Sequence, residues 1–398
     1  MFSIKLSSLE IVNRKTLILI CLLVIAGIMA FVINAIQKPS NNISNSGLKQ
    51  ATLPTKTCPV GFILVPGNKL YNTGDFCVMK YEAKCADVSN PNLGLTPLPG
   101  NVCSGLSVDG GFAGVYKNNG SNCACIASNN KQIVSTKSGF PITYISMSDN
   151  TSNNAKSYCQ SNGWHVITNN EWMTIARNAE QVKNNWCDVN GTNCGAQPGT
   201  KGKILANGHN DNINEKTASA GGIGALIATG DAKPCFGTTS DGSNSCGGKS
   251  SQKRTLSLSN GNILWDFAGN VWEWVNMEVL RKDQPESKSN GVFDLGWLKS
   301  DFAPGSLPSV ITDNGLGLSL GYNSFRPSNP TWNANNGVGR IYHYSDPNDT
   351  SSILYAFIRG GNWRHFEDDG AFTIHMSPPA TTENIDDVGF RCATASLQ

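Results

Sequence analysis

Side chains able to do chemistry are concentrated in one short run near the C-terminus. Residues 358–379 read IRGGNWRHFEDDGAFTIHMSPP, with arginine, histidine and carboxylate side chains only a few positions apart. Such a mixture could hold a hard cation through its oxygens, act as an acid–base pair, or form a surface that contacts another molecule. The choice depends on which side chains the local structure would bring together.

The spacing within this run disfavours the first two possibilities. Glu367, Asp368 and Asp369 are consecutive, and neighbouring side chains in an extended chain point to opposite faces, which opposes a compact cation cage. His365 and His375 could pair, but no nucleophile or positioned carboxylate is evident beside them. We therefore predict no metal site and no catalytic residue here, and interpret the run as ligand contacts or plain surface.

Composition excludes one class of partner. The chain has 398 residues with a net charge of +2 and 15% charged residues, so it lacks the basic field that nucleic-acid binding requires. A hydrophobic content of 39% is enough for a core, and 41 glycines among recurrent Asn and Ser clusters indicate a loop-rich fold.

The cysteine count indicates an oxidising compartment. Of 13 cysteines, Cys21 lies in an apolar run, and the 12 that remain allow up to six bridges. Zinc is disfavoured because paired CxxC knuckles are absent. Cys58, Cys77 and Cys85 lie close together in the sequence and would cross-link the start of the predicted ectodomain. The local pairs that fit short bridges are Cys187 with Cys194 and Cys235 with Cys246.

The N-terminal region predicts a membrane anchor. Residues 16–36 are apolar apart from Thr16 and Asn34, and a helix of this length spans a hydrocarbon core of about 30 Å. The preceding basic residues, which place residues 1–15 in the cytoplasm, are Lys5, Arg14 and Lys15. The alternative is a cleaved signal peptide, but the run is long for one and its cleavage signal is poor. We expect an uncleaved signal anchor and an extracellular C-terminal part.

The remaining chain divides into a linker and one large domain. Residues 37–57 are polar and predict a flexible stalk, and residues 58–398 form the predicted ectodomain, with a loop-rich insertion at 86–139. Helices are expected within 150–163 and 165–186; the second begins with a capping box from Thr168 to Glu171. Short strands follow, so we predict an α+β fold.

Four motifs in order resemble a known family. They are YCQSNGWHVITNNEWMTIARN, WDFAGNVWEWV, FIRGGNW and GFRCA, and together they resemble the C-type-lectin-like domains of the formylglycine-generating-enzyme, or sulfatase-modifying factor, type. The resemblance covers roughly residues 58–393 and implies a C-type lectin fold, with two helices packed on short twisted antiparallel sheets and long disulfide-tied loops. It also implies a long bridge from the first helix to the last strand, Cys159–Cys392.

The activities of that family need residues that this sequence lacks. Its oxidases carry two cysteines, two and seven residues after the tryptophan of RGGNW, whose soft sulfurs suit copper(I). Those positions are His365 and Gly370 here. Its iron-dependent sulfoxide synthases need a histidine cluster on a helical domain, whereas the 5 histidines of this chain include no HxxxH pair. A divergent oxidase is therefore the disfavoured alternative, and we predict that the protein is not an enzyme.

The runs CPVGFILVPG and FCVMKYEAKC, followed by ITNNEWMTIARN, TLSLSNGNILWDFAGNVWEW, and RGGNW with GAFT and GFRC, carry a narrower resemblance, to the variable proteins of diversity-generating retroelements. Those proteins present a hypervariable C-terminal surface on a lectin-like scaffold, with variation at template adenines. Here the variable, ligand-binding segment would be residues 358–393, and Glu367, Met376 and Glu383 would be fixed because adenine changes in Asn-type codons cannot produce them. The predicted ligand-binding residues are Trp363, Arg364, His365, Phe366, Asp368, Asp369, Ile374, His375, Ser377, Thr381, Thr382, Asn384, Asp386 and Asp387.

The resemblance leaves the ligand open. We expect a macromolecule, a protein on another cell or virus surface, and no cofactor, although the family allows a structural calcium near Asn270 and Glu273. Sugar binding through a Glu-Pro-Asn type loop is unsupported because no such loop is present. The tryptophans expected to pack in the core rather than bind sugar are Trp265, Trp272 and Trp274. A purely structural envelope protein is a further alternative.

Overall fold

The computed structural model describes most of the predicted ectodomain. The described residues are 56–395 without 99, 107–111, 120–121, 189–192, 211–252, 285–287, 290–291, 294–297, 301, 303–309, 314–317, 344–345, 347, 365–367 and 383–384. The predicted anchor at 16–36 lies outside them. Among the described residues, none of the helices has the length and apolar character needed to span a membrane.

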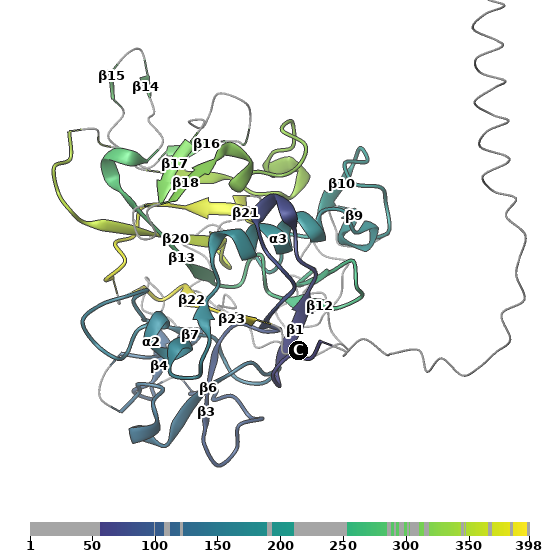
Figure 1. Ribbon diagram of the computed structural model, residues 1–398. Coiled ribbons are helices and arrows are strands. Elements are labelled where there is room, and N and C mark those ends of the chain that lie inside the picture. Colours follow the sequence, from purple (N-terminus) through teal and green to yellow (C-terminus); the bar gives the residue numbers. More distant parts are fainter. Residues whose placement is uncertain are drawn as a thin grey trace, which may run out of the picture. The chain divides into compact units, whose positions relative to one another are not determined.

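A six-stranded sheet forms the centre of the domain (Figure 1). Strand β13 is antiparallel to β20 and parallel to β22, so the WEW motif is hydrogen-bonded on both sides. The strand order is β16 (Leu298–Ser300), β19 (Ile341–His343), β21 (Gly370–His375), β20 (Leu354–Gly360), β13 (Trp272–Leu280) and β22 (Val388–Phe390). Because β20 and β21 are antiparallel neighbours in the middle of this order, the loop between them lies at one end of the strands.

A second sheet joins the beginning of the domain to its end. Strand β23 pairs antiparallel with both β2 and β8, so the last strand lies between two segments from the first half of the domain. The order is β1 (Phe62–Val65), β2 (Phe76–Met79), β23 (Cys392–Ala395) and β8 (His165–Val166).

Two α-helices are described, and both match sequence signals. Helix α2 (Ala155–Gln160) carries Cys159 in its last turn, and α3 (Asn169–Ala179) starts with the predicted capping box, in which the Thr168 side chain accepts from the Glu171 amide. Helix α3 packs against β13 and β21. Its Trp172 is fully buried, stacks on Phe267 at 3.9 Å between ring centroids and donates to the Ala371 carbonyl.

The remaining elements are short. The small sheets are β3–β6 (Lys84–Asp87, Lys131–Val134), β4–β5–β7 (Ser104–Leu106, Phe112–Lys117, Ile142–Thr143), β9–β10 (Trp186–Asp188, Lys203–Leu205), β11–β12 (Thr255–Ser257, Ile263–Trp265), β14–β15 (Lys288–Ser289, Val292–Phe293) and β17–β18 (Val310–Asp313, Leu318–Gly321). The 3-10 turns are η1 (Lys69–Tyr71), η2 (Ala127–Asn129), η3 (Lys183–Asn185), η4 (Arg281–Asp283), η5 (Tyr322–Ser324) and η6 (Ala334–Asn336).

Few helices and several small sheets agree with the α+β prediction. The predicted insertion at 86–139 is more regular than expected, because β4, β5 and β6 lie within it.

Five disulfides cross-link the described part of the domain. The structure forms Cys159–Cys392, the bridge that the resemblance implied, together with the local bridges Cys58–Cys77 and Cys187–Cys194. The two bridges that the sequence did not resolve are Cys85–Cys125 and Cys103–Cys123. All ten cysteines within the described ranges are therefore oxidised.

The other predicted short bridge, between Cys235 and Cys246, is not among these five. Cys235 and Cys246 both fall in residues 211–252, outside the part of the chain that the structure describes. The Cys235–Cys246 pairing is therefore not confirmed and stays a prediction from their spacing of 11 residues in the sequence.

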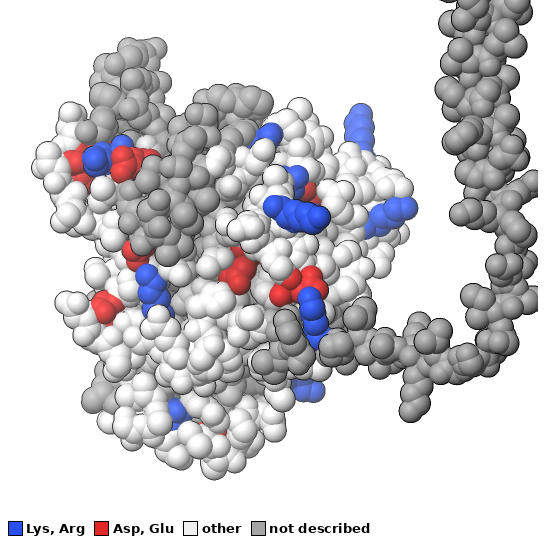
Figure 2. All heavy atoms as spheres, viewed as in Figure 1, with Lys and Arg blue, Asp and Glu red and all other residues white. Residues whose placement is uncertain are grey.

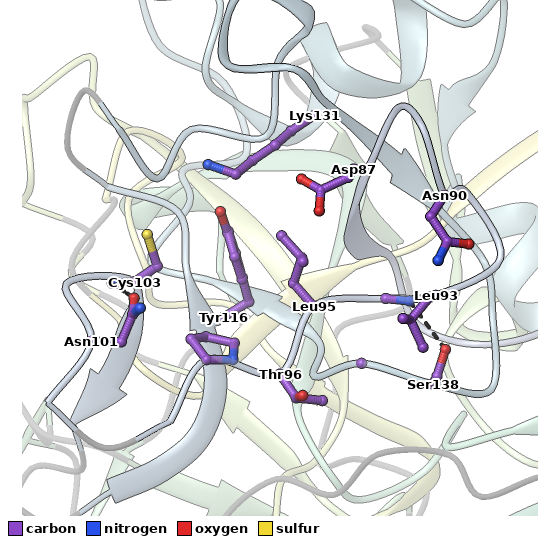
Figure 3. A pocket seen from close by; sticks show the side chains of 13 residues that line it. Asp87, Asn90, Leu93, Leu95, Thr96, Asn101, Cys103, Tyr116, Lys131 and Ser138 are labelled. Carbon is purple, nitrogen blue, oxygen red and sulfur yellow. Dashed lines mark hydrogen bonds between the residues drawn. The ribbon is translucent and has the colours of Figure 1, made fainter.

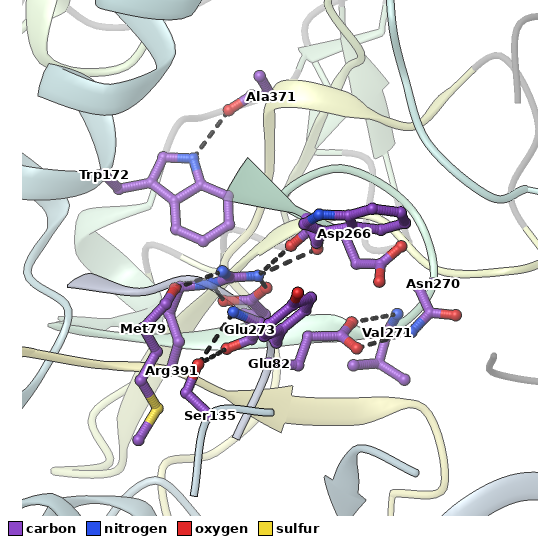
Figure 4. Close-up of polar contacts among 12 residues, drawn as sticks. Met79, Glu82, Ser135, Trp172, Asp266, Asn270, Val271, Glu273, Ala371 and Arg391 are labelled. Carbon is purple, nitrogen blue, oxygen red and sulfur yellow. Dashed lines mark hydrogen bonds and ion pairs between the residues drawn. The ribbon is translucent and has the colours of Figure 1, made fainter. Parts of the chain in front are cut away.

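A buried ionic cluster joins the two larger sheets (Figure 4). Arg391 is completely buried and donates to both oxygens of Glu273, and Arg254 pairs with Asp266 at 2.5 Å. Burial raises the pKa of the Glu273 carboxyl, and the Arg391 guanidinium opposes that rise. Figure 2 shows charged side chains of both signs scattered over one face of the molecule.

Candidate functional site

The predicted contact segment starts at a glycine pair after β20. Gly360 and Gly361 have φ of +91° and +88°, a region that favours glycine. A Cβ on Gly361 would lie 1.8 Å from Asp369 Oδ1, so a side chain there would displace the loop between β20 and β21. The RGG motif therefore turns the chain sharply and lets Asp369 approach the backbone.

An ion-pair group follows, centred on Arg364. Arg364 Nη2 lies 2.5 Å from Asp386 Oδ2, and its Nη1 lies 3.8 Å from Asp387 Oδ2. Asn362 donates its side-chain amide to Asp387, and the Arg364 guanidinium covers the Trp363 ring at 4.6 Å. Burial raises the pKa of both Asp386 and Asp387, and the Arg364 charge opposes it. The group connects the β20–β21 loop to the chain just before β22.

A second polar group is centred on Asp368. Its side chain accepts from the Tyr342 hydroxyl at 3.0 Å and lies 2.8 Å from Arg340 Nε, while its carbonyl accepts from Thr373 Oγ1 at 2.8 Å. Burial and the nearby Asp368 carboxylate raise the pKa of Tyr342. Asp368 thus fixes the loop, and Asp369 Oδ1 accepts from the Asn362 amide at 3.3 Å, so these two carboxylates hold separate partners; Glu367 lies outside the described residues.

His375 lies among aromatic rings at the end of β21. Its ring centroid is 5.7 Å from that of Trp272 and 5.4 Å from that of Tyr342, and its side chain is buried. The neighbouring Ile374 is fully buried in the main core. Neither residue has the exposure that direct contact with a macromolecule needs in this arrangement.

Burial separates the predicted ligand-binding residues into three groups. Thr381 is exposed, and Ser377, Thr382 and Asp387 are partly buried. His365, Phe366 and Asn384 lie outside the described residues. The buried members are Trp363, Arg364, Asp368, Asp369, Ile374, His375 and Asp386.

Sequence reasoning missed the residues that hold these side chains. Asn362 could have been found, because it is part of the RGGNW motif and caps the turn by accepting from the Arg364 amide at 2.9 Å. Arg340 and Tyr342 carried no signal, since they belong to the short strand β19 and its approach, and reach Asp368 only through the parallel β19–β21 pairing.

The donor sets available here limit the chemistry. Among the described residues no group of three or more His, Cys, Asp or Glu side chains could hold a metal ion. Asn270 and Glu273, the residues expected near a structural calcium, do not fit a calcium ion that they would hold together. Both Glu273 oxygens accept from Arg391, and the Asn270 amide donates to Glu82 at 2.7 Å. Cys392 is in a disulfide and therefore offers no thiol as a nucleophile.

Comparison with known families identifies the domain. Residues 109–396 match the family model described as sulfatase-modifying factor enzyme 1-like domain. The chain belongs to this family. No curated protein matches the chain. The family match covers the six-stranded sheet, both described helices and the predicted contact segment, and it begins after strands β1 to β4.

Proposed function

We propose that this sulfatase-modifying factor-like domain binds a macromolecular ligand and does not catalyse a reaction. One observation carries the proposal: the polar residues of the C-terminal segment form ion pairs and hydrogen bonds that hold two loops in place, with Thr381 exposed beside them. A fixed frame beneath exposed side chains is what a binding surface requires, because preorganised loops lose little entropy on association.

The finer assignment is a C-type lectin fold on a membrane-anchored variable protein of a diversity-generating retroelement. The bridge between α2 and β23 supports the lectin-like fold, and residues 16–36 supply the proposed signal anchor that would leave the domain outside the cell. The proposed partner is a protein on another cell or virus surface.

Burial limits which positions of the predicted variable segment can change. Met376, predicted to be fixed, is completely buried in the main core, in agreement with a framework role. Ile374 is equally buried although adenine changes could produce it, so its variants would be restricted to apolar residues of similar volume. Burial does not restrict substitutions at Thr381, which is exposed, or at Thr382, which is only partly buried. The Arg364–Asp386 pair would have to vary jointly.

The experiment is deep sequencing of this gene from many isolates of its host. We expect adenine-directed changes in the codons of residues 364–387, with Glu367, Met376 and Glu383 constant, and a nearby near-copy of the segment beside a reverse transcriptase gene. The codons of 165–186, around α3, are the matched control and should vary at the background rate. Equal variation in both segments would refute the variable-protein assignment.

The division into frame and surface has its own test. Ile374→Ala should lower the free energy of unfolding by about 2–5 kcal/mol, since it empties a buried site, whereas Thr381→Ala should change it by less than about 0.5 kcal/mol. Denaturant titration monitored by tryptophan fluorescence measures both. A large loss from Thr381→Ala would contradict the surface role.

The alternative is a divergent formylglycine-generating-type oxidase. The cysteine positions after Trp363 are His365 and Gly370, which disfavours it. Incubation with copper(I), oxygen and a cysteine-containing peptide, followed by hydrazide capture of aldehyde, tests it directly. We expect no aldehyde, and copper-dependent aldehyde formation would overturn the non-enzymatic proposal.

A further inference from the structure

A cavity of about 520 Å³ lies between the β3–β6 ladder and the chain that follows β3 (Figure 3). The β3–β6 ladder is on the opposite side of the domain from β16–β18 (Figure 1). Leu95, Pro97 and the Tyr116 ring line it, and Asp87 and Lys131 lie at one end. Its volume is in the range of small-molecule sites. Most of its lining precedes residue 109, where the family match begins, so the proposed ligand surface does not account for it.

Covalent bridges make the walls rigid. Cys85, in β3, is bonded to Cys125, and Cys103, which lines the cavity, is bonded to Cys123. The Tyr116 hydroxyl donates to the Cys123 carbonyl at 2.8 Å, which fixes the ring that forms part of the floor. A ligand would therefore enter a site that is already formed, at a low entropic cost.

Two opposite charges face this cavity without neutralising each other. Asp87 and Lys131 are directly opposed in the antiparallel β3–β6 register, so their side chains lie on the same face of the ladder. They form no ion pair with each other. Lys131 Nζ donates to the Asn122 carbonyl at 2.7 Å, which leaves the ammonium with two further protons to donate. The partly buried Asp87 side chain has no hydrogen bond or ion pair within the described part of the chain.

The chain segment that supplies most of the cavity lining, residues 87–103, also carries exposed apolar side chains. Val88, Leu93, Leu98 and Val102 are exposed by 46%, 55%, 74% and 75%, and all four lie between residues 88 and 102. Leu93 itself lines the cavity. Leu93 therefore adds exposed apolar surface to the cavity, and exposed apolar surface commonly marks a binding site.

We propose that this cavity binds a free α-amino acid with an apolar side chain. The α-ammonium group would pair with Asp87, the α-carboxylate with Lys131, and the side chain would lie on Leu95, Pro97 and the Tyr116 ring. A ligand with one charge would leave either Asp87 or Lys131 unmatched. An α-amino acid carries both charges on one carbon, which matches two residues opposed across a single ladder position.

The test uses the full chain in detergent and saturation-transfer difference NMR with three probes. L-leucine carries both charges, leucinamide lacks the carboxylate, and 4-methylpentanoate lacks the ammonium. We expect leucine to bind at least tenfold more tightly than either of the others. Asp87→Asn should abolish the advantage of leucine over 4-methylpentanoate, and Lys131→Met the advantage over leucinamide.

Matched controls separate this result from general surface effects. Asp188→Asn and Lys201→Met change the same residue types on or beside the β9–β10 hairpin, away from the cavity, and should leave all three affinities unchanged. Melting temperatures of all variants establish that each is folded. Equal binding of the three probes, no binding of any, or leucine binding that survives both cavity substitutions would overturn the proposal. None of these outcomes bears on the macromolecular ligand proposed above.

Discussion

Replacing Arg391 by methionine would test the buried ionic cluster that joins the two larger sheets. The Arg391 guanidinium is fully buried and donates to both oxygens of Glu273. It also donates to the carbonyls of Met79 at 3.1 Å, Trp265 at 3.2 Å and Asp266 at 3.2 Å. Methionine fills a similar volume and provides no donor, so the change takes this donor away from one carboxylate and three carbonyls.

The expected loss is large compared with the stability of a domain. Removing one partner of a buried ion pair costs about 3–5 kcal/mol, because the remaining charge is uncompensated. Whole domains are stable by only about 5–15 kcal/mol. With an unfolding entropy of about 2.1 cal/mol/K per residue over a domain of roughly 340 residues, this loss should lower the melting temperature by about 4–7 °C.

The pH dependence identifies the cause of this loss. Burial raises the pKa of Glu273 even in the presence of Arg391, and without the guanidinium it should rise further. A carboxyl with a raised pKa in the folded state is destabilising when ionised. The variant should therefore be closest to the wild type below the ordinary value of 4.5 and lose stability as pH rises through the folded-state pKa.

Urea titrations at pH 4 and pH 7 measure both effects. Arg326→Met is the matched control, since Arg326 is only partly buried and its guanidinium donates to the nearby Asn323 side chain; its effect should stay below about 0.5 kcal/mol. A double variant, Glu273→Gln with Arg391→Met, should recover part of the stability at pH 7. The reasoning is refuted if Arg391→Met costs less than about 1 kcal/mol at pH 7, or costs the same at both pH values.

Three further predictions concern the Cys159–Cys392 disulfide, the glycine pair after β20 and the Glu273 carboxylate. Replacing Cys159 and Cys392 by serine opens a loop of 233 residues and should cost about 5 kcal/mol in the chain-entropy model, measured by denaturant titration; an unchanged midpoint would contradict it. Gly361→Ala should lower the melting temperature by several degrees, because its φ is +88° and Asp369 occupies the Cβ position, whereas Gly74→Ala, with open space around it, should not; equal effects would remove the proposed role of the glycine pair. Chelation of calcium should leave the melting temperature unchanged, because the Glu273 carboxylate is already engaged by an arginine, and a fall of several degrees would reveal a calcium site.

Local signals in the sequence determined the elements that depend on local physics. The capping box from Thr168 to Glu171 fixes the start of α3, since both of its hydrogen bonds span three residues. The position of Trp272 and Trp274 within alternating strand patterns predicted their burial, which the structure confirms. Ordered motifs then indicated the family.

Short cysteine spacing is a local signal of the same kind. It predicted the bridge between Cys187 and Cys194, which the structure confirms. The bridge between Cys235 and Cys246, predicted on the same ground, is not tested, because both cysteines lie outside the described residues. A short loop costs little entropy to close, so spacing alone can favour such a pair.

Only the tertiary structure decided what the charged C-terminal residues do. In the sequence, Arg364, Asp368 and Asp386 look like interchangeable contact residues. Their partners are 22 residues away for Arg364, and on a different strand for Asp368, so only the pairing of β19, β20 and β21 shows that they are buried and mutually satisfied. The same holds for Asp87 and Lys131, whose opposition across one ladder position depends on a register that no local pattern specifies. Charge–charge contacts between distant segments are properties of the packed chain, because the energy that selects them exists only after the sheets have formed.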